Sequence, residues 1–288
     1  MPIGRTRFGP AGRPINYKGP TEKIPEYLKT QEGLDAFEYQ AVRGVRISKE
    51  KAEELGNNAK EFDVLLSLHA PYAINLSSSS EETRKASIER LVLSMQAAQW
   101  MGARIVVFHP GYYGKFSKEE ALELCITALK EVNERASSLG IKHVFLGPET
   151  MGKLSQVGSV EEIITMCENV PNAVPVIDWA HIHARTGGSL RRKDDYLKIL
   201  DIIEKRLGSD VVSNLHCHFT KVEFTKKGER RHRRLDEEGY GPDFEILATI
   251  IVEHGYSFTI ISESPVLDKD AIVMKSILER IKNTIKQT

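Results

Sequence analysis

The sequence predicts an α/β protein folded as a single (β/α)8 TIM barrel over residues 1–288. Short apolar runs rich in β-branched residues alternate with longer amphipathic segments along the whole chain, as strand–helix units of a parallel sheet do. The length of 288 residues is close to the roughly 250 residues of a single α/β barrel. An open doubly wound sheet is less consistent with the sequence, because no glycine-rich phosphate turn follows a strand candidate.

The strand candidates are short and almost wholly apolar, as expected where both faces of a parallel sheet are buried. The clear ones are 64–68, 104–108, 142–146, 174–177, 211–215 and 257–261. Two weaker candidates, at 2–7 and 36–42, bring the set to the eight strands that a closed barrel needs.

Helices are expected between these strands, at 48–60, 82–102, 117–139, 159–169, 192–207, 243–254 and 268–286. The second of them places Ile88, Leu91 and Met95 on one stripe and ends at Gly102, which favours helix termination. Ser117 and Glu120 have the spacing of a capping box at the start of the third. We expect no linker and no second domain.

Composition narrows the functional class. Lys plus Arg and Asp plus Glu each number 40, so the net charge is zero and a charged partner must meet a local patch. The three cysteines form no C-x-x-C pair, which argues against a disulfide framework or a thiolate zinc site. Neither a signal peptide nor an apolar run of about 20 residues is visible. We therefore expect a cytoplasmic protein that does not enter a membrane.

Each clear strand candidate is followed by a histidine or a carboxylate. Barrel enzymes place their chemistry at the carboxyl ends of the strands, which all lie on one face. The residues are His69, His109, Glu149, Asp178, His216 and Glu263, with His181 three positions after Asp178. Each alone has an ordinary explanation, such as a helix N-cap for Asp178. Their recurrence at equivalent positions predicts one convergent cluster.

A cluster of this kind is suited to divalent metal ions. Nitrogen and carboxylate ligands without thiolates favour Zn²⁺, with Mn²⁺ or Fe²⁺ as alternatives. The ligands outnumber what one tetrahedral ion needs, so the sequence predicts two or three ions. Clusters with ions roughly 3.5–4 Å apart are used to hydrolyse phosphodiesters.

Two basic segments, 185–193 and 221–234, follow strands that carry these residues and are expected to rim the same mouth. The candidate DNA-binding side chains are Arg191, Arg192, Lys226, Lys227, Arg230 and Arg231. Lys and Arg side chains neutralise phosphates, which is what affinity for DNA requires. A solvated basic loop balanced by acids elsewhere is the alternative.

In their order and spacing, the motifs resemble the endonuclease IV family, a group of AP endonucleases within the xylose isomerase-like barrels. The resemblance extends over about residues 1–285 and indicates a divergent branch. The matching motifs are HAPY at 69–72, INL at 74–76, HPG at 109–111, ETMG at 149–152, VG at 157–158, IDWAH at 177–181, LH at 215–216 and ESP at 263–265.

The resemblance implies three sets of metal ligands. The first is His69, His109 and Glu149. The second is Glu149, Asp178, His216 and Glu263, so that Glu149 bridges two ions. The third consists of His181 and an Asp-x-His pair. His232 is present for this pair, but Arg230 stands where the aspartate is expected. Glu229 or His218 can take the place of the aspartate.

The resemblance also implies the reaction. Tyr72 matches a family residue that enters DNA at the lesion. Glu149 would orient or deprotonate the water that attacks phosphorus on the 5′ side of an abasic nucleotide. The expected protein is a monomeric AP endonuclease acting on damaged double-stranded DNA in base excision repair. A sugar isomerase or epimerase of the same superfamily, and a DNA-binding barrel without catalysis, are the alternatives.

Overall fold

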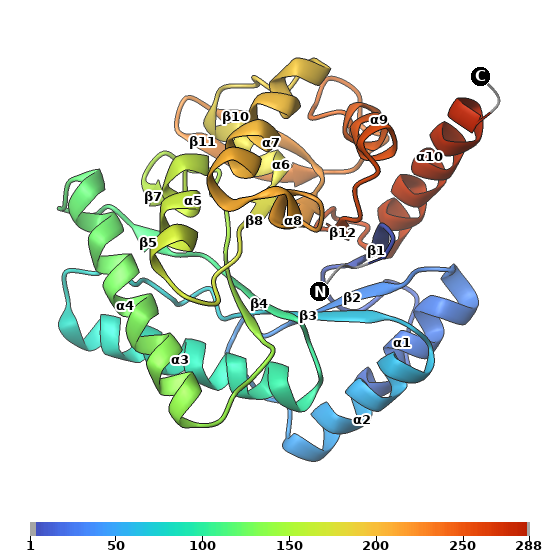
Figure 1. Ribbon diagram of the computed structural model, residues 1–288. Helices are drawn as coiled ribbons and strands as arrows, with labels where there is room; N and C mark the ends of the chain where they lie inside the picture. Colours follow the sequence, from blue (N-terminus) through green and yellow to red (C-terminus); the bar gives the residue numbers. More distant parts are fainter. Residues whose placement is uncertain (1–3, 287–288) are drawn as a thin grey trace.

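The computed structural model describes residues 4–286 and confirms the predicted barrel. Within that range, eight parallel strands surround a central axis and the helices lie outside them (Figure 1). The barrel strands are β1 (Arg7–Pro10), β2 (Ala36–Gln40), β3 (Leu65–His69), β4 (Ile105–Phe108), β6 (Phe145–Pro148), β8 (Val176–Asp178), β9 (His216–Phe219) and β12 (Thr259–Ser262).

The strands form two halves that join into a ring. One half has the order β2-β3-β4-β6 and the other β1-β12-β9-β8. Isolated parallel bridges connect the halves on both sides. Ala11 pairs with Glu38 on one side, and Leu146 with Ala173 and Glu149 with Val176 on the other. At one seam β1 and β2 approach so closely that a Cβ on Gly9 would lie 1.8 Å from the Ala36 carbonyl oxygen. Glycine is therefore required at position 9.

The helices agree closely with the sequence-based prediction. The helical segments are η1 (Thr21–Lys23), α1 (Ile24–Tyr27), η2 (Leu28–Glu32), α2 (Lys49–Glu61), α3 (Glu81–Trp100), α4 (Lys118–Ser138), α5 (Val160–Asn169), α6 (Trp179–Arg185), α7 (Lys193–Leu207), α8 (Ser209–Val212), α9 (Phe244–His254) and α10 (Asp268–Lys286). Ser117 and Glu120 form the expected capping box at α4. None of the described helices combines the length and apolarity needed to cross a bilayer.

Two further strand pairs lie outside the barrel wall. One is the short pair β5 (Gly111–Tyr112) and β7 (Gln156–Val157). The other is the hairpin of β10 (Lys221–Thr225) and β11 (Gly228–Arg233). The basic segment expected as a loop at 221–234 is therefore mostly an antiparallel hairpin.

Two strand predictions differ from the structure. The segment 211–215 was wrong as a strand, because residues 209–212 form α8 and the strand begins only at His216. The first strand, expected at 2–7, starts at Arg7, and residues 2–3 of that prediction lie outside the described residues. The first prediction was wrong because the spacing of apolar residues does not distinguish a helix from a strand in a segment this short.

Candidate metal centre

Five of the predicted residues meet at the carboxyl end of the barrel. His69 is the last residue of β3 and Asp178 the last of β8, while His109, Glu149 and Glu263 directly follow β4, β6 and β12. Because these strands are parallel, their carboxyl ends share one face. The chemistry of that face is thus set by residues far apart in the sequence.

The first group is built around one oxygen of Glu149. Its Oε2 lies 3.4 Å from His69 Nε2 and 3.1 Å from His109 Nε2. The Tyr72 ring stacks on the His109 ring, with centroids 5.2 Å apart and planes inclined by 9°. Glu149 and His69 are buried, whereas Tyr72 is 49% exposed. Tyr72 therefore covers the solvent side of this group.

The second group uses the other oxygen of Glu149. Its Oε1 lies 3.0 Å from Nδ1 of His218, and the same nitrogen is 3.5 Å from Glu263 Oε1. Asp178 belongs to this group, since its ligand oxygen lies within 4.8 Å of those of the other members. Glu149 therefore presents one oxygen to each of two groups, as a bridging carboxylate does.

The structure places His218, and not His216, in this group. His216 is the first residue of β9, and its Nε2 lies 3.0 Å from Glu38 Oε2 inside the barrel. Two residues along a strand keep a side chain on the same face but move it by about 6.6 Å. The strand predicted at 211–215 put His216 at the strand end, and the resemblance named it as a ligand. In the structure it is His218, two residues further on, that lies near Glu149 and Glu263.

The third group contains no aspartate and is built around His181 and His232. Glu229 Oε2 lies 3.3 Å from His181 Nε2, and Glu229 Oε1 lies 3.4 Å from His232 Nε2. A ligand atom of Glu263 also lies within 4.8 Å of those of His181 and His232. Of the two substitutes considered for the missing aspartate, Glu229 is the one that lies between these histidines.

A β-bulge brings Glu229 and His232 together. In the hairpin register, Glu223 pairs with Arg231 and Phe224 with Glu229, which leaves Arg230 as an extra residue in β11. Residues three apart in a regular strand face opposite sides, and one bulged residue puts them on the same side. The bulge therefore puts Glu229 and His232 on the same side of the strand, as residues two apart would be in a regular strand.

The hairpin is also fixed by two facing glycines. Gly228 has φ of +94°, and a Cβ there would lie 2.1 Å from the carbonyl oxygen of Gly152. A Cβ on Gly152 would lie 2.7 Å from Cβ of Glu229. The Glu229 amide donates a hydrogen bond to that Gly152 carbonyl at 3.1 Å. The close approach of the two backbones thus sets the position of Glu229.

The three groups fit metal ions by their unsatisfied atoms. Buried polar atoms without a hydrogen-bond partner among the described residues include His69 Nε2, Glu149 Oε2, Asp178 Oδ2 and His232 Nε2. They are distributed over all three groups, and such atoms are costly unless an ion or water satisfies them. The ligands are nitrogen and oxygen only, which suits zinc, manganese or iron. The residues present therefore fit the predicted ions.

The charged groups of the site also fit bound metal ions. Burial alone would raise the pKa of Glu149, but the surrounding histidines, His218 foremost, hold that pKa well below its usual range. Burial raises the pKa of Asp178 to about 6. Burial would lower the pKa of His232, but Glu229 and Glu263 outweigh burial and raise that pKa to about 9. Without metal, protons on His181, His218 and His232, whose pKa values are raised, place positive charge beside the carboxylates.

The residues expected to bind DNA are placed differently from one another. Lys226, Lys227 and Arg231 are exposed on the hairpin. Arg230 is paired with Glu223 at 2.6 Å, and Arg192 with Asp195 at 3.8 Å. Arg191 donates from Nε to the Gly188 carbonyl at 2.8 Å. Part of the basic segment is therefore engaged with groups of the protein itself.

Comparison with known proteins places the chain in a family. A sequence profile of the xylose isomerase-like TIM barrels matches residues 28–283. The chain belongs to this family. This chain is 33% identical over 269 residues to an uncharacterized protein of Methanocaldococcus jannaschii, and the match covers 93% of this chain and 94% of that one. It is 27% identical over 272 residues to a probable endonuclease 4 of Mycoplasmopsis synoviae, covering 92% and 89%.

Solved structures share the fold. Endonuclease IV from Thermus thermophilus superimposes with a TM-score of 0.71 at 23% identity, covering 95% of this chain and 99% of that one. A D-tagatose 3-epimerase-like protein gives a TM-score of 0.66 at 22% identity, covering 92% and 93%. The predicted resemblance to the endonuclease IV family is thus confirmed, and the xylose isomerase-like barrel has solved neighbours named for two different chemistries.

Proposed function

We propose that this xylose isomerase-like barrel is a metal-dependent phosphodiester hydrolase that cleaves DNA on the 5′ side of abasic sites. The observation that carries the proposal is the third group. His181, His232 and Glu263 offer ligand atoms close to one another, and Glu229 reaches each of the two histidines with a different oxygen. A site for several ions around one bridging carboxylate suits the hydrolysis of a phosphodiester better than the enolisation of a sugar.

The side chains have distinct tasks in this reaction. Divalent ions, when bound, polarise the phosphate and make water a nucleophile near neutral pH. Glu149, whose low pKa keeps it ionised, orients the attacking water or accepts its proton. Asp178, His218 and Glu263 face the same carboxylate from the other side. The nucleophile is water, and the side chains at the mouth act as ligands and as a base.

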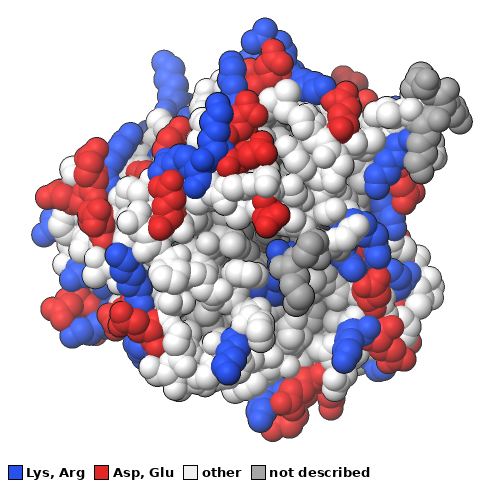
Figure 2. Space-filling view, in the orientation of Figure 1, with Lys and Arg blue, Asp and Glu red and all other residues white. Residues whose placement is uncertain are grey.

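The surface at the mouth suits a nucleic acid at a few points. Tyr72 is exposed and lies flat on a ligand of the first group, where it can fill the gap left by a displaced nucleotide. Lys226, Lys227 and Arg231 are free to meet phosphates. Away from the mouth, on the face that Figure 2 shows, Lys and Arg are mixed with Asp and Glu. Affinity therefore depends on a few cations near the site.

The proposal is tested with a labelled duplex that carries one tetrahydrofuran abasic analogue. Metal-replete protein should cut 5′ to the analogue and leave a 3′ hydroxyl, and it should leave a matched undamaged duplex intact. Chelator should abolish the cut, and added zinc or manganese should restore it. Metal-replete protein that leaves the analogue intact contradicts the proposal. Epimerisation of a ketose by the same preparation would favour the sugar enzyme instead.

A further inference from the structure

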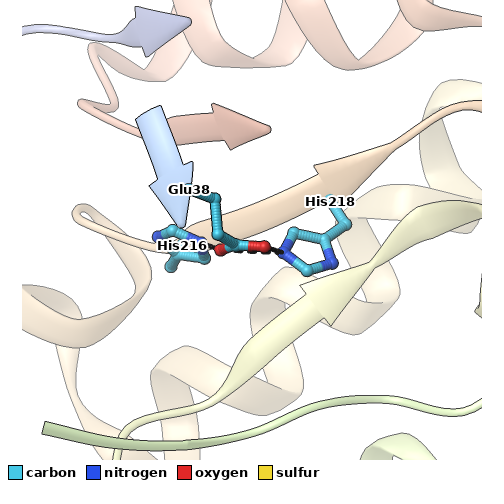
Figure 3. A group of neighbouring side chains, drawn as sticks. All are labelled: Glu38, His216 and His218. Atoms are coloured by element: carbon cyan, nitrogen blue, oxygen red, sulfur yellow. Dashed lines mark hydrogen bonds and ion pairs between the residues drawn. The ribbon is translucent and has the colours of Figure 1, made fainter. Parts of the chain in front are cut away.

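A buried polar group lies inside the barrel, next to the proposed metal centre. Glu38, on β2, is completely buried. Its carboxylate lies between His216 and His218 of β9, and both rings point toward it (Figure 3). Nε2 of His216 is 3.0 Å from Glu38 Oε2, and Nε2 of His218 is 3.1 Å from Glu38 Oε1. No sequence motif indicated Glu38.

The ligand geometry of this group would admit a metal ion, but its hydrogen bonds argue otherwise. Glu38 also accepts hydrogen bonds from Ser67 Oγ at 2.9 Å and from Gln40 Nε2 at 3.1 Å. The carboxylate thus has partners on both oxygens, and none of its atoms is unsatisfied, in contrast to those of the three groups above. Glu38 is therefore better explained as a hydrogen-bond acceptor than as a ligand.

His218 differs from His69, His181 and His232 in what holds its second nitrogen. The Nδ1 atoms of His69, His181 and His232 lie 2.8–3.0 Å from the backbone carbonyls of Ala70, Thr150 and Glu263. Their Nε2 atoms therefore face the carboxylates of the first and third groups. In His218 the arrangement is reversed, because Nε2 is directed at the Glu38 carboxylate and Nδ1 faces Glu149 and Glu263.

We propose that Glu38 is the positioning residue for His218. It keeps the proton on Nε2, so that the Nδ1 lone pair is directed into the second group, and its negative charge makes that nitrogen a stronger ligand. His216 and Ser67 hold the carboxylate in place from the other side. The inference rests on the metal centre of the proposed function, but not on the substrate.

The test is metal affinity, measured by chelator competition on the full chain. The variants are Glu38→Gln, which removes the charge at nearly constant volume, and Ser67→Ala, which removes one hydrogen bond to Glu38 and leaves its charge. Removing a partner that orients a metal ligand costs about 10- to 100-fold in affinity. We expect that loss in E38Q and a smaller loss in S67A, because Glu38 there keeps its charge and its contacts with His216 and Gln40. Equal affinity in wild type and E38Q overturns the inference.

A second measurement requires no variant. In zinc-loaded wild-type protein, ¹⁵N NMR of the histidines should show His218 protonated at Nε2 and bound through Nδ1, opposite to His69, His181 and His232. The reverse tautomer overturns the inference. Both readouts are independent of DNA cleavage, so a protein that binds metal but leaves abasic DNA intact would refute the proposed function and not the role of Glu38. Wild-type protein that binds no metal refutes both.

Discussion

Glu229 Oε1 lies 3.4 Å from His232 Nε2, although two residues separate them on one strand. The relationship depends on the bulge at Arg230 and on the contact of Gly228 with Gly152. It supplies a carboxylate where the related motif has an aspartate one position closer. The third group of the metal centre is therefore a product of backbone geometry as much as of sequence.

Removing the Glu229 carboxylate should empty the third group alone. In Glu229→Ala, His181 and His232 keep their backbone contacts but lose the carboxylate between them. We expect the metal content to fall by about one ion per chain and cleavage to fall on the order of 100-fold, similar to the loss of one electrostatic catalytic group. Elemental analysis and single-turnover cleavage measure the two effects. Arg230→Ala is the control, and an E229A protein with full metal content would contradict the assignment.

The exchange of His216 for His218 in the second group has its own test. His218→Gln should lose an ion, because the amide replaces the Nδ1 ligand between Glu149 and Glu263. His216→Gln should keep its ions, since a glutamine amide can still donate to Glu38. Metal content after dialysis distinguishes the two variants. Loss of metal from H216Q with full retention in H218Q would restore the original prediction.

Metal binding should release protons and weaken in acid. In the metal-free protein the pKa of His232 is about 9, because Glu229 and Glu263 outweigh the effect of burial. At pH 7 the ring is therefore charged, and an ion must displace its proton. Below pH 9, each unit of acidification should cost up to about tenfold in affinity for the one proton that the metal displaces from His232. Calorimetry in two buffers of different ionisation enthalpy counts the protons, and a count of zero at pH 7 would refute this view.

The same shift affects the stability of the metal-free protein. The folded pKa of His232 lies above its unfolded value of roughly 6.5. Its contribution to stability is thus complete below about pH 6.5 and is lost as the pH rises through about 9. Glu229→Gln should reduce this loss between pH 6.5 and 9. Denaturant titration of metal-free wild-type and variant protein measures the difference, and identical pH profiles would contradict the assignment.

Free and paired cations of the hairpin should differ in their effect on DNA binding. The double variant Lys226→Ala, Lys227→Ala should reduce the slope of log affinity against log salt by about one for each phosphate that is no longer neutralised. Arg230→Ala should leave the slope nearly unchanged, because Arg230 is paired with Glu223. Fluorescence anisotropy with abasic duplex at several salt concentrations gives the slopes. A larger effect of R230A than of the double variant would reverse the assignment.

The closure of the barrel can be tested at Gly9. Gly9→Ala would place a methyl group 1.8 Å from the Ala36 carbonyl oxygen, so β1 and β2 must separate. We expect a loss of at least about 2 kcal/mol in the free energy of unfolding, at the upper range of overpacking effects. Gly33→Ala, where only the positive φ opposes a side chain, should cost about 1–2 kcal/mol. Unchanged stability of G9A would show that β1 and β2 can separate at little cost, against this expectation.

The sequence predicts most of the barrel because strand ends and helix caps are local signals. Five strand ends carry the expected histidines and carboxylates in the expected order, and residues such as Ser117 and Glu120 begin their helix as expected. The residue of β9 that faces Glu149 could not be predicted in this way. The largely apolar segment 211–215 is compatible with a helix as well as with a strand. His218 was considered only as a substitute for the missing aspartate.

Two features of the site leave no local signal. The bulge in β11 arises from pairing with β10 and from contact with Gly152, so the spacing of Glu229 and His232 looks wrong in the sequence. Glu38 stands in a weak strand candidate, and its partners His216 and His218 are about 180 residues away in the sequence. Only the closure of the barrel brings these side chains together.

The most direct measurement is the anomalous diffraction of zinc-loaded crystals at the zinc edge. Separate peaks are expected beside His69 and His109, beside Asp178 and His218, and beside His181 and Glu229, with Glu149 between the first two. A peak enclosed by Glu38, His216 and His218, with none beside Glu149, would contradict the proposed metal centre.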